Sequence, residues 1–228
     1  MAAPVVFLFD VDDTLFDNDA FEADWRARLE EAFGEAGRER YWRHFERLRK
    51  DLGYADYLGA VQEYRKDVAD DARLLDLSSF LLDYPFADRL FPGALDVVAH
   101  LGAHGPTVIL SDGDVIFQPR KIQRSGLADA VARRVLVYVH KQERLADVER
   151  LYPAAHYVMV DDKVAVLAAM KRAWGPRLTT VFARQGHYAH DPALLADNPP
   201  ADIAVGHVRD LLAVDVARLL ALGRAAGQ

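Results

Sequence analysis

Residues 5–19 read VVFLFDVDDTLFDND, five apolar side chains followed by four acidic residues within the next eight positions. A short run of consecutive apolar residues favours a strand buried in a sheet. The carboxylates that follow it repel one another when they are crowded together, unless something compensates their charge. Acidic residues also favour the start of a helix, but here they end an apolar strand. The segment therefore predicts a strand that brings several carboxylates to one place.

Four further apolar runs recur along the chain, and each leads into polar residues. They are TVIL (107–110), VLVYV (135–139), YVMV (157–160) and TTVFA (179–183). Continuous apolarity is typical of strands covered on both faces of a parallel sheet. Helical patterns such as residues 95–101 and 165–174 lie between the runs. This alternation predicts an α/β fold, a Rossmann-like open parallel sheet with helices on both faces.

The rhythm of strands and helices is interrupted between the first two runs. Residues 17–89 contain no comparable β run, and their apolar residues recur at helical spacing. The spacing predicts four helices, near residues 21–33, 42–52, 58–68 and 74–84. We therefore expect a small α-helical cap domain over residues 17–89, inserted into an α/β core domain made of residues 1–16 and 90–228.

Composition limits the classes of function. The 228 residues carry a formal net charge of −7 and no cysteine, which argues against a nucleic-acid partner and excludes disulfides and thiolate metal sites. The basic stretch RERYWRHFERLRK (38–50) has apolar residues at helical spacing and is interpreted as a solvated helix. The first ten residues show neither a signal sequence nor a membrane span. We expect a cytoplasmic protein without a membrane partner, and its oligomeric state stays open.

The polar residues that follow the predicted strands form one group, because ligands of open α/β sheets bind beyond the carboxyl ends of the strands. The group comprises Asp10, Asp12, Asp13, Thr14, Ser111, Asp112, Gly113, Lys141, Asp161 and Asp162. Several carboxylates in one crevice tolerate each other when a hard divalent cation with oxygen ligands is present, and Mg²⁺ suits such a site when a phosphate also binds.

These residue types together suit phosphoryl transfer. A carboxylate attacks phosphorus directly and forms an aspartyl-phosphate. A second carboxylate two residues later supplies a proton to the leaving alcohol and afterwards removes one from water. A hydroxyl, backbone N–H groups and a lysine stabilise the charge on the transferring group.

The motifs DVDDTL (10–15), ILSDG (109–113) and VMVDDK (158–163), with Lys141 between the last two, resemble the haloacid dehalogenase-like (HAD) hydrolase superfamily in identity and order. The resemblance covers the predicted core, and the insert is similar in being a helical cap between the first and second motifs. It implies an α/β hydrolase with bound Mg²⁺ whose cap closes over the sheet.

The resemblance also implies a role for each motif residue. Asp10 is the expected nucleophile and a metal ligand, and Asp12 is the expected acid/base, with its backbone carbonyl also on Mg²⁺. The expected phosphate-binding residues are Ser111, Asp112, Gly113 and Lys141. Asp162 is the preferred further metal ligand, with Asp161 holding metal-bound water or Lys141, and the division between these two stays open. Lys141 is followed by QERL rather than by proline, so Lys121 is the alternative lysine.

A Mg²⁺-dependent phosphatase that acts on a small phosphorylated metabolite is the function these features favour. Haloacid dehalogenases lack an acid/base at the position of Asp12, because a leaving halide needs no proton. A phosphomutase retains both aspartates and is an alternative. A phosphoacceptor module similar to bacterial receiver domains is about half this length and has no helical insert. A degenerate relative that binds phosphate without turnover is the last alternative.

Selection of the leaving group is expected from cap residues that face the crevice. The candidates are Asp17, Asn18, Arg47, Lys50 and Arg65. His187 and His190 have a spacing that could suit a metal, but no zinc-type motif accompanies them. We interpret their segment as a polar loop.

Overall fold

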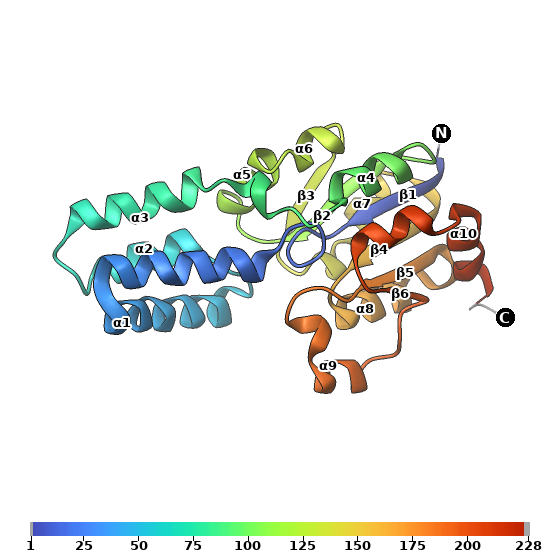
Figure 1. Ribbon diagram of the computed structural model, residues 1–228. Coiled ribbons are helices and arrows are strands. Elements are labelled where there is room, and N and C mark those ends of the chain that lie inside the picture. The colour runs from blue at the N-terminus through green and yellow to red at the C-terminus, as the bar shows by residue number, and fades with distance from the viewer. Residues whose placement is uncertain (1, 226–228) are drawn as a thin grey trace.

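The computed structural model describes residues 2–225 and confirms the predicted α/β fold. Six parallel strands form one sheet in the order β3-β2-β1-β4-β5-β6 (Figure 1). Their bounds are β1 Ala3–Phe9, β2 Thr107–Asp112, β3 Val135–Tyr138, β4 Ala154–Asp161, β5 Leu178–Ala183 and β6 Ile203–Val205. The strand order reverses between β1 and β4, so the crevice expected of such sheets lies beyond the end of β1. The sequence pattern had predicted all of these strands except β6.

Helices cover both faces of the sheet, as the continuous apolarity of the strands predicts. Phe7 and Phe9 of β1 share one hydrophobic cluster with α4, α5 and α10, whereas Leu8 belongs to a second cluster with α7 and α8. The helices outside the insert are α4 Ala94–Gly102, α5 Phe117–Arg124, α6 Leu127–Ala130, α7 Leu145–Leu151, α8 Val164–Trp174, α9 Pro192–Ala196 and α10 Val216–Ala225. Successive residues of β1 thus pack on opposite faces.

The insert between β1 and β2 is helical and forms a cap beyond the carboxyl end of β1 (Figure 1). It consists of α1 Asn18–Leu52, α2 Tyr57–Tyr64 and α3 Asp71–Asp83. The first two predicted helices form one element, α1, which is interrupted by non-helical backbone at Gly34 (φ 68°, ψ 175°). Glycine adopts this left-handed conformation without the steric cost of a side chain. The chain reverses there, so that Trp25 and Tyr41 of the two halves contact each other (ring centroids 5.3 Å), and the prediction of separate helices near residues 21–33 and 42–52 is confirmed.

Two chain segments connect the cap to the sheet, and they lie side by side. The N–H group of Asp17 donates to the carbonyl of Arg89 (2.8 Å), and that of Phe91 donates to the carbonyl of Leu15 (2.9 Å). Phe16 forms an antiparallel bridge with Leu90 between them. The helices of the cap fall within residues 17–89; the division into two domains at these bounds stays a prediction.

The alanine-rich C-terminal stretch ARLLALGRAAGQ (217–228) predicts a final helix, and α10 (Val216–Ala225) is that helix. The predicted continuation over residues 226–228 lies outside the described residues. Among residues 2–225, no helix combines the length and the apolarity that a membrane crossing requires.

Candidate active site

Three predicted site residues meet where the central strands end. Asp10 follows β1, Asp161 ends β4 and Asp162 comes next, and all three are buried. The N–H group of Asp10 donates to the carbonyl of Val160 (3.0 Å), which continues the pairing of the two strands. One carboxylate oxygen from each aspartate lies within 4.8 Å of the others. Neighbouring parallel strands therefore bring these carboxylates together, as the sequence predicts.

Lys141, which follows β3, places its ammonium group between two of these carboxylates. Its Nζ lies 2.5 Å from Oδ1 of Asp10 and 2.7 Å from Oδ2 of Asp161. The backbone N–H of Lys141 donates to Oδ1 of Asp112 (2.7 Å), which fixes the loop that carries the lysine. Lys121, the alternative lysine, contacts Asp12 instead.

The two neighbouring acids of the DDK motif have different surroundings. Asp161 contacts Lys141 through Oδ2 and accepts the N–H of Lys163 through Oδ1 (2.8 Å). Asp162 is 1% exposed, and neither of its carboxylate oxygens has a hydrogen-bond partner among residues 2–225. Buried polar groups normally have a partner. The free oxygens of Asp162 are therefore suited to a cation, whereas Asp161 holds the lysine.

The pKa values of two carboxyl groups in this cluster are raised, which indicates that the cluster lacks compensating positive charge. Burial raises the pKa of Asp10 to about 6; Lys141 acts in the opposite direction and Asp161 adds to the rise. Burial also raises the pKa of Asp162 well above its ordinary value. For Lys141, burial acts to lower the pKa, but Asp10 and Asp161 outweigh it, so that this pKa lies above its usual range. An oxygen-liganded divalent cation would favour the ionised form of the carboxylates.

Asp12 and Ser111 are linked by a residue that the sequence interpretation missed. The side-chain amide of Gln118 donates to Oδ2 of Asp12 (3.0 Å) and to Oγ of Ser111 (2.9 Å). Oδ1 of Asp12 accepts from Nζ of Lys121 (2.6 Å).

The N–H of Gly113, a predicted phosphate-binding residue, donates to the carbonyl of Tyr138 (3.0 Å). That N–H group is therefore already paired here.

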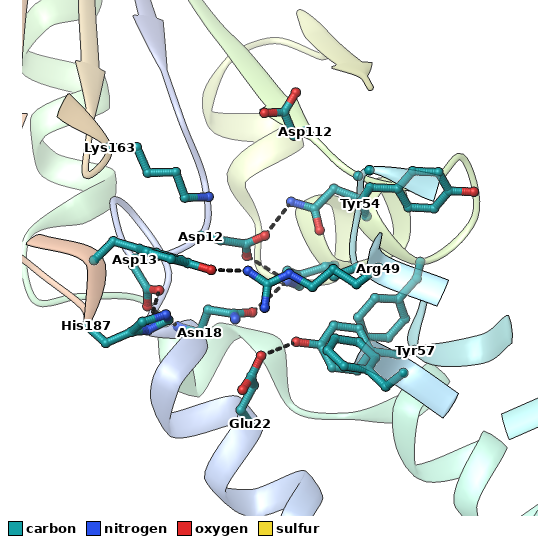
Figure 2. A pocket seen from close by; sticks show the side chains of 18 residues that line it. Asp12, Asp13, Asn18, Glu22, Arg49, Tyr54, Tyr57, Asp112, Lys163 and His187 are labelled. Atoms are coloured by element: carbon teal, nitrogen blue, oxygen red, sulfur yellow. Dashed lines mark hydrogen bonds and ion pairs between the residues drawn. The ribbon is translucent and has the colours of Figure 1, made fainter. Parts of the chain in front are cut away.

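A cavity of about 160 Å³ lies between the cap and the carboxyl ends of the strands (Figure 2). Residues from both parts line it, among them Asn18, Glu22 and Arg49 of the cap and Asp12, Lys121 and Lys163 of the core. Charged and polar side chains from both parts point into this space. The cavity is suited to a small polar leaving group.

The predicted cap candidates divide into residues near the cavity and residues away from it. Asn18 lines the cavity, whereas Asp17 caps α1 by accepting the N–H of Ala20 (2.8 Å). Arg47 and Arg65 pair with acidic residues of the cap, and Lys50 is exposed outside the cavity lining. Arg49 is the arginine that lines the cavity. It lies four positions after Phe45, another lining residue, so helical spacing was the available signal.

The loop after β5 connects the core to the cap. Arg49 donates to the hydroxyl of Tyr188, and the N–H of His187 donates to Oδ2 of Asp19 (2.8 Å). Nδ1 of His187 lies 2.5 Å from Oδ1 of the same aspartate and 3.9 Å from Oδ2 of Asp13. Burial raises the pKa of Asp13 to about 7, with Asp19 and Asp12 adding to the rise. The segment is a loop, as predicted, but His187 does have carboxylate neighbours.

Comparison with known proteins agrees with this arrangement of carboxylates, lysine and helical insert. Residues 5–173 match the family model of the haloacid dehalogenase-like hydrolases. The chain belongs to this family. A haloacid dehalogenase-like hydrolase from Burkholderia xenovorans is 60% identical, with 96% of this chain and 99% of that chain covered and a TM-score of 0.90. The predicted resemblance to HAD hydrolases is thus confirmed.

More distant HAD-like structures share the fold. L-2-haloacid dehalogenase from Xanthobacter autotrophicus is 19% identical over 92% of this chain and 96% of that chain, with a TM-score of 0.59. The HAD-hydrolase YfnB from Bacillus subtilis, bound to magnesium, is 18% identical over 92% of this chain and 98% of that chain, with a TM-score of 0.62. A comparison with curated protein sequences finds no match.

Proposed function

We propose that this HAD-like hydrolase is a Mg²⁺-dependent phosphatase that hydrolyses a small phosphorylated metabolite through an aspartyl-phosphate on Asp10. The observation that carries the proposal is Asp12, a second carboxylate two residues after Asp10 that lines the cavity beside the buried carboxylate cluster. A leaving alcohol needs a proton donor at this position, whereas a leaving halide does not. The small polar cavity supports a small substrate. The absence of cysteine agrees with the cytoplasmic location that we propose.

In the first half-reaction, a carboxylate oxygen of Asp10 attacks phosphorus, and the bond between phosphorus and the leaving oxygen breaks. The carboxyl group of Asp12 transfers its proton to that oxygen, so the product leaves as a neutral alcohol. Lys141 remains beside Asp10 and offsets the negative charge that the incoming phosphoryl group adds to the crevice.

In the second half-reaction, a water oxygen attacks the phosphorus of the aspartyl-phosphate. Asp12, now a carboxylate, takes a proton from that water, and the bond between phosphorus and the Asp10 oxygen breaks. Inorganic phosphate leaves, and Asp10 returns to its starting form. Asp12 is thereby reprotonated for the next turnover, so the cycle needs no other proton carrier.

The residues present fit a magnesium ion. The two unpartnered, buried oxygens of Asp162 are the decisive feature, because such groups need a partner that residues 2–225 do not supply. Asp162, Asp10 and the backbone carbonyl of Asp12 would hold the ion, while Asp161 positions Lys141. When bound, Mg²⁺ supplies positive charge that stabilises the phosphoryl oxygens. The magnesium bound to YfnB supports the same choice of metal.

The proposal is tested with purified protein and a panel of small phosphate monoesters, assayed for phosphate release with Mg²⁺ and with EDTA. Release that needs Mg²⁺ is expected. The Asp10→Asn variant should lose turnover while its circular dichroism stays unchanged, because it lacks the charged nucleophile. Turnover retained in that variant would contradict the covalent role. Release of halide from 2-chloropropionate without phosphatase activity would replace the proposal by dehalogenation.

A further inference from the structure

We propose that Lys121 and Gln118 of α5 are positioning residues that hold the Asp12 carboxylate in place for its proton transfers. The inference rests on the proposed function, in which Asp12 is the acid/base. Gln118 and Lys121 are three positions apart on one helix, so their side chains lie on the same face. We call these two side chains the Asp12 clamp.

The Asp12 clamp gives each carboxylate oxygen one donor. Nζ of Lys121 lies 2.6 Å from Oδ1, and Nε2 of Gln118 lies 3.0 Å from Oδ2. Each oxygen has further lone-pair capacity for a proton or for a water molecule. The Asp12 side chain is 25% exposed and lines the cavity, whereas that of Lys121 is 1% exposed. Gln118 and Lys121 also line the cavity, so the clamp holds the carboxylate at the cavity wall and leaves it partly accessible there.

The surroundings of Lys121 are unusual for an ammonium group. Its Nζ lies 5.0, 5.5 and 5.6 Å from the ring centroids of Phe16, Phe21 and Phe117. Asn18 supplies one more acceptor, with Oδ1 at 3.1 Å. Burying a charge in such a place is costly unless it is paired. An apolar side chain would fill the same aromatic cage without that cost, and exchanging a buried ion pair for apolar groups is often neutral or stabilising. Stability alone thus gives little reason for a lysine here.

The clamp also connects Asp12 to the phosphate-binding side of the site. The amide of Gln118 uses one N–H for Asp12 and the other for Oγ of Ser111 (2.9 Å). Gln118 itself is buried. The proposed acid/base and the proposed phosphate-binding hydroxyl are therefore held by one planar group. Gln118 thereby fixes the position of the Asp12 carboxylate relative to Ser111. A proton transfer from Asp12 to the leaving oxygen depends on such a fixed distance.

The kinetic test compares two substrates that differ in their need for a proton. Lys121→Met and Gln118→Leu are assayed in single turnovers with Mg²⁺, using phenyl phosphate and 2,4-dinitrophenyl phosphate. Phenolate is a poor leaving group that benefits from protonation, whereas dinitrophenolate leaves without it. We expect bond cleavage in Lys121→Met to slow by about 100-fold with phenyl phosphate. With dinitrophenyl phosphate it should change by less than about threefold, because no proton is needed.

The matched control is Lys171→Met. Lys171 also pairs with an aspartate, Asp202, at 2.8 Å, but it lies near the C-terminal end of α8 and outside the cavity lining. This variant should leave both rates unchanged. Equal slowing of both substrates in Lys121→Met, or no slowing of either, would overturn the proposal. If Lys121→Met does not fold, Gln118→Leu tests the proposal instead, because it retains the ion pair between Lys121 and Asp12. The measurement is again the slowing with phenyl phosphate relative to that with 2,4-dinitrophenyl phosphate.

A crystallographic test works without any activity. In crystals of Lys121→Met we expect the Asp12 side chain to rotate away from its present position, while it stays in place in Lys171→Met. An Asp12 carboxylate that keeps its position without Lys121 would overturn the clamp. A wild-type protein that hydrolyses no phosphate ester would contradict the proposed function instead, and the crystals would still decide on the clamp.

Discussion

The ammonium nitrogen of Lys141 lies 2.5 Å from Oδ1 of Asp10, and both side chains are buried at the end of the central strands. The positive charge acts to lower the pKa of Asp10, against the larger effect of burial. Removing it leaves the proposed nucleophile beside Asp161 without the ammonium group that these two carboxylates share. The nucleophile then ionises less readily.

Lys141→Met is accordingly expected to lower kcat/KM for a phosphate monoester by about 100-fold or more, because a charge that stabilises the transferring group is lost. The loss should be larger at pH 6 than at pH 8, since the pKa of Asp10 rises further. Profiles of kcat/KM against pH for the wild type and the variant measure this. Superimposable profiles, differing only in scale, would argue against the contact between Lys141 and the nucleophile.

The stability of the metal-free protein should fall as the pH rises from about 4 to about 7. The folded-state pKa values of Asp10 (about 6) and Asp13 (about 7) exceed the ordinary value of 3.8. The folded protein therefore binds more protons than the unfolded chain in this window, and the free energy of unfolding decreases with pH. Asp10 alone accounts for a decrease on the order of 3 kcal/mol.

Urea denaturation in EDTA at pH 5 and pH 7.5 measures this difference. Aspartates with lowered pKa values, such as Asp24 and Asp71, titrate below this window and do not cancel the effect. Asp13→Asn should flatten the dependence, since it removes one of the groups responsible. Stability that increases over the window would show that the buried carboxylates ionise more easily than their burial indicates.

Mg²⁺ should stabilise the folded protein, and Asp162 should be required for the effect. At a magnesium concentration 100 times the dissociation constant, binding adds about 2.7 kcal/mol to the free energy of unfolding. Asp162→Asn should lose most of this gain, because it removes a charged ligand whose oxygens accept no hydrogen bond from the described part of the chain. Melting temperatures with and without MgCl₂ provide the measurement.

The control for that experiment is Asp129→Asn, which changes an exposed ion pair with Arg133 far from the carboxylate cluster. It should keep the full magnesium-induced shift. An equal shift in Asp162→Asn would instead assign the cation to other ligands.

Arg49 should affect substrate binding more than stability. It lines the cavity and donates to the hydroxyl of Tyr188 across the boundary between cap and core, yet its side chain is 43% exposed. Arg49→Ala should raise KM about 10-fold and change the free energy of unfolding by less than about 0.5 kcal/mol. Arg47→Ala, on the same helix but paired with Glu63, is the matched control and should leave KM unchanged. Equal effects of both variants would exclude a specific role for Arg49.

The sequence predicted those parts of the site that depend on strand order alone. Asp10, Lys141, Asp161 and Asp162 each follow or end a parallel strand, and the carboxyl ends of such strands meet at one edge. Their convergence therefore needs no knowledge of side-chain packing. Lys141 was preferred to Lys121 because it directly follows an apolar run, whereas Lys121 lies within the helix α5.

The predictions that were wrong concern which side of a cap helix faces the cavity. One position along a helix turns a side chain by roughly 100°, so Arg47 and Arg49 point in different directions although they are neighbours in sequence. Which of them faces the cavity is decided by how α1 packs, and that packing depends on contacts far along the chain. The break at Gly34, by contrast, agrees with the end of the first predicted cap helix near residue 33. β6 has only three residues, Ile203–Val205, too few for a pattern.

The paired segments at Phe16 and Leu90 have a consequence for how such enzymes diversify. The chain leaves and re-enters the sheet through backbone groups bonded to each other, so both covalent connections of the cap helices to the core lie at one place. A graft made there could replace α1–α3 by another lid, while Lys141 and the buried aspartates keep their mutual distances. New leaving groups could then be selected without rebuilding the chemistry beneath.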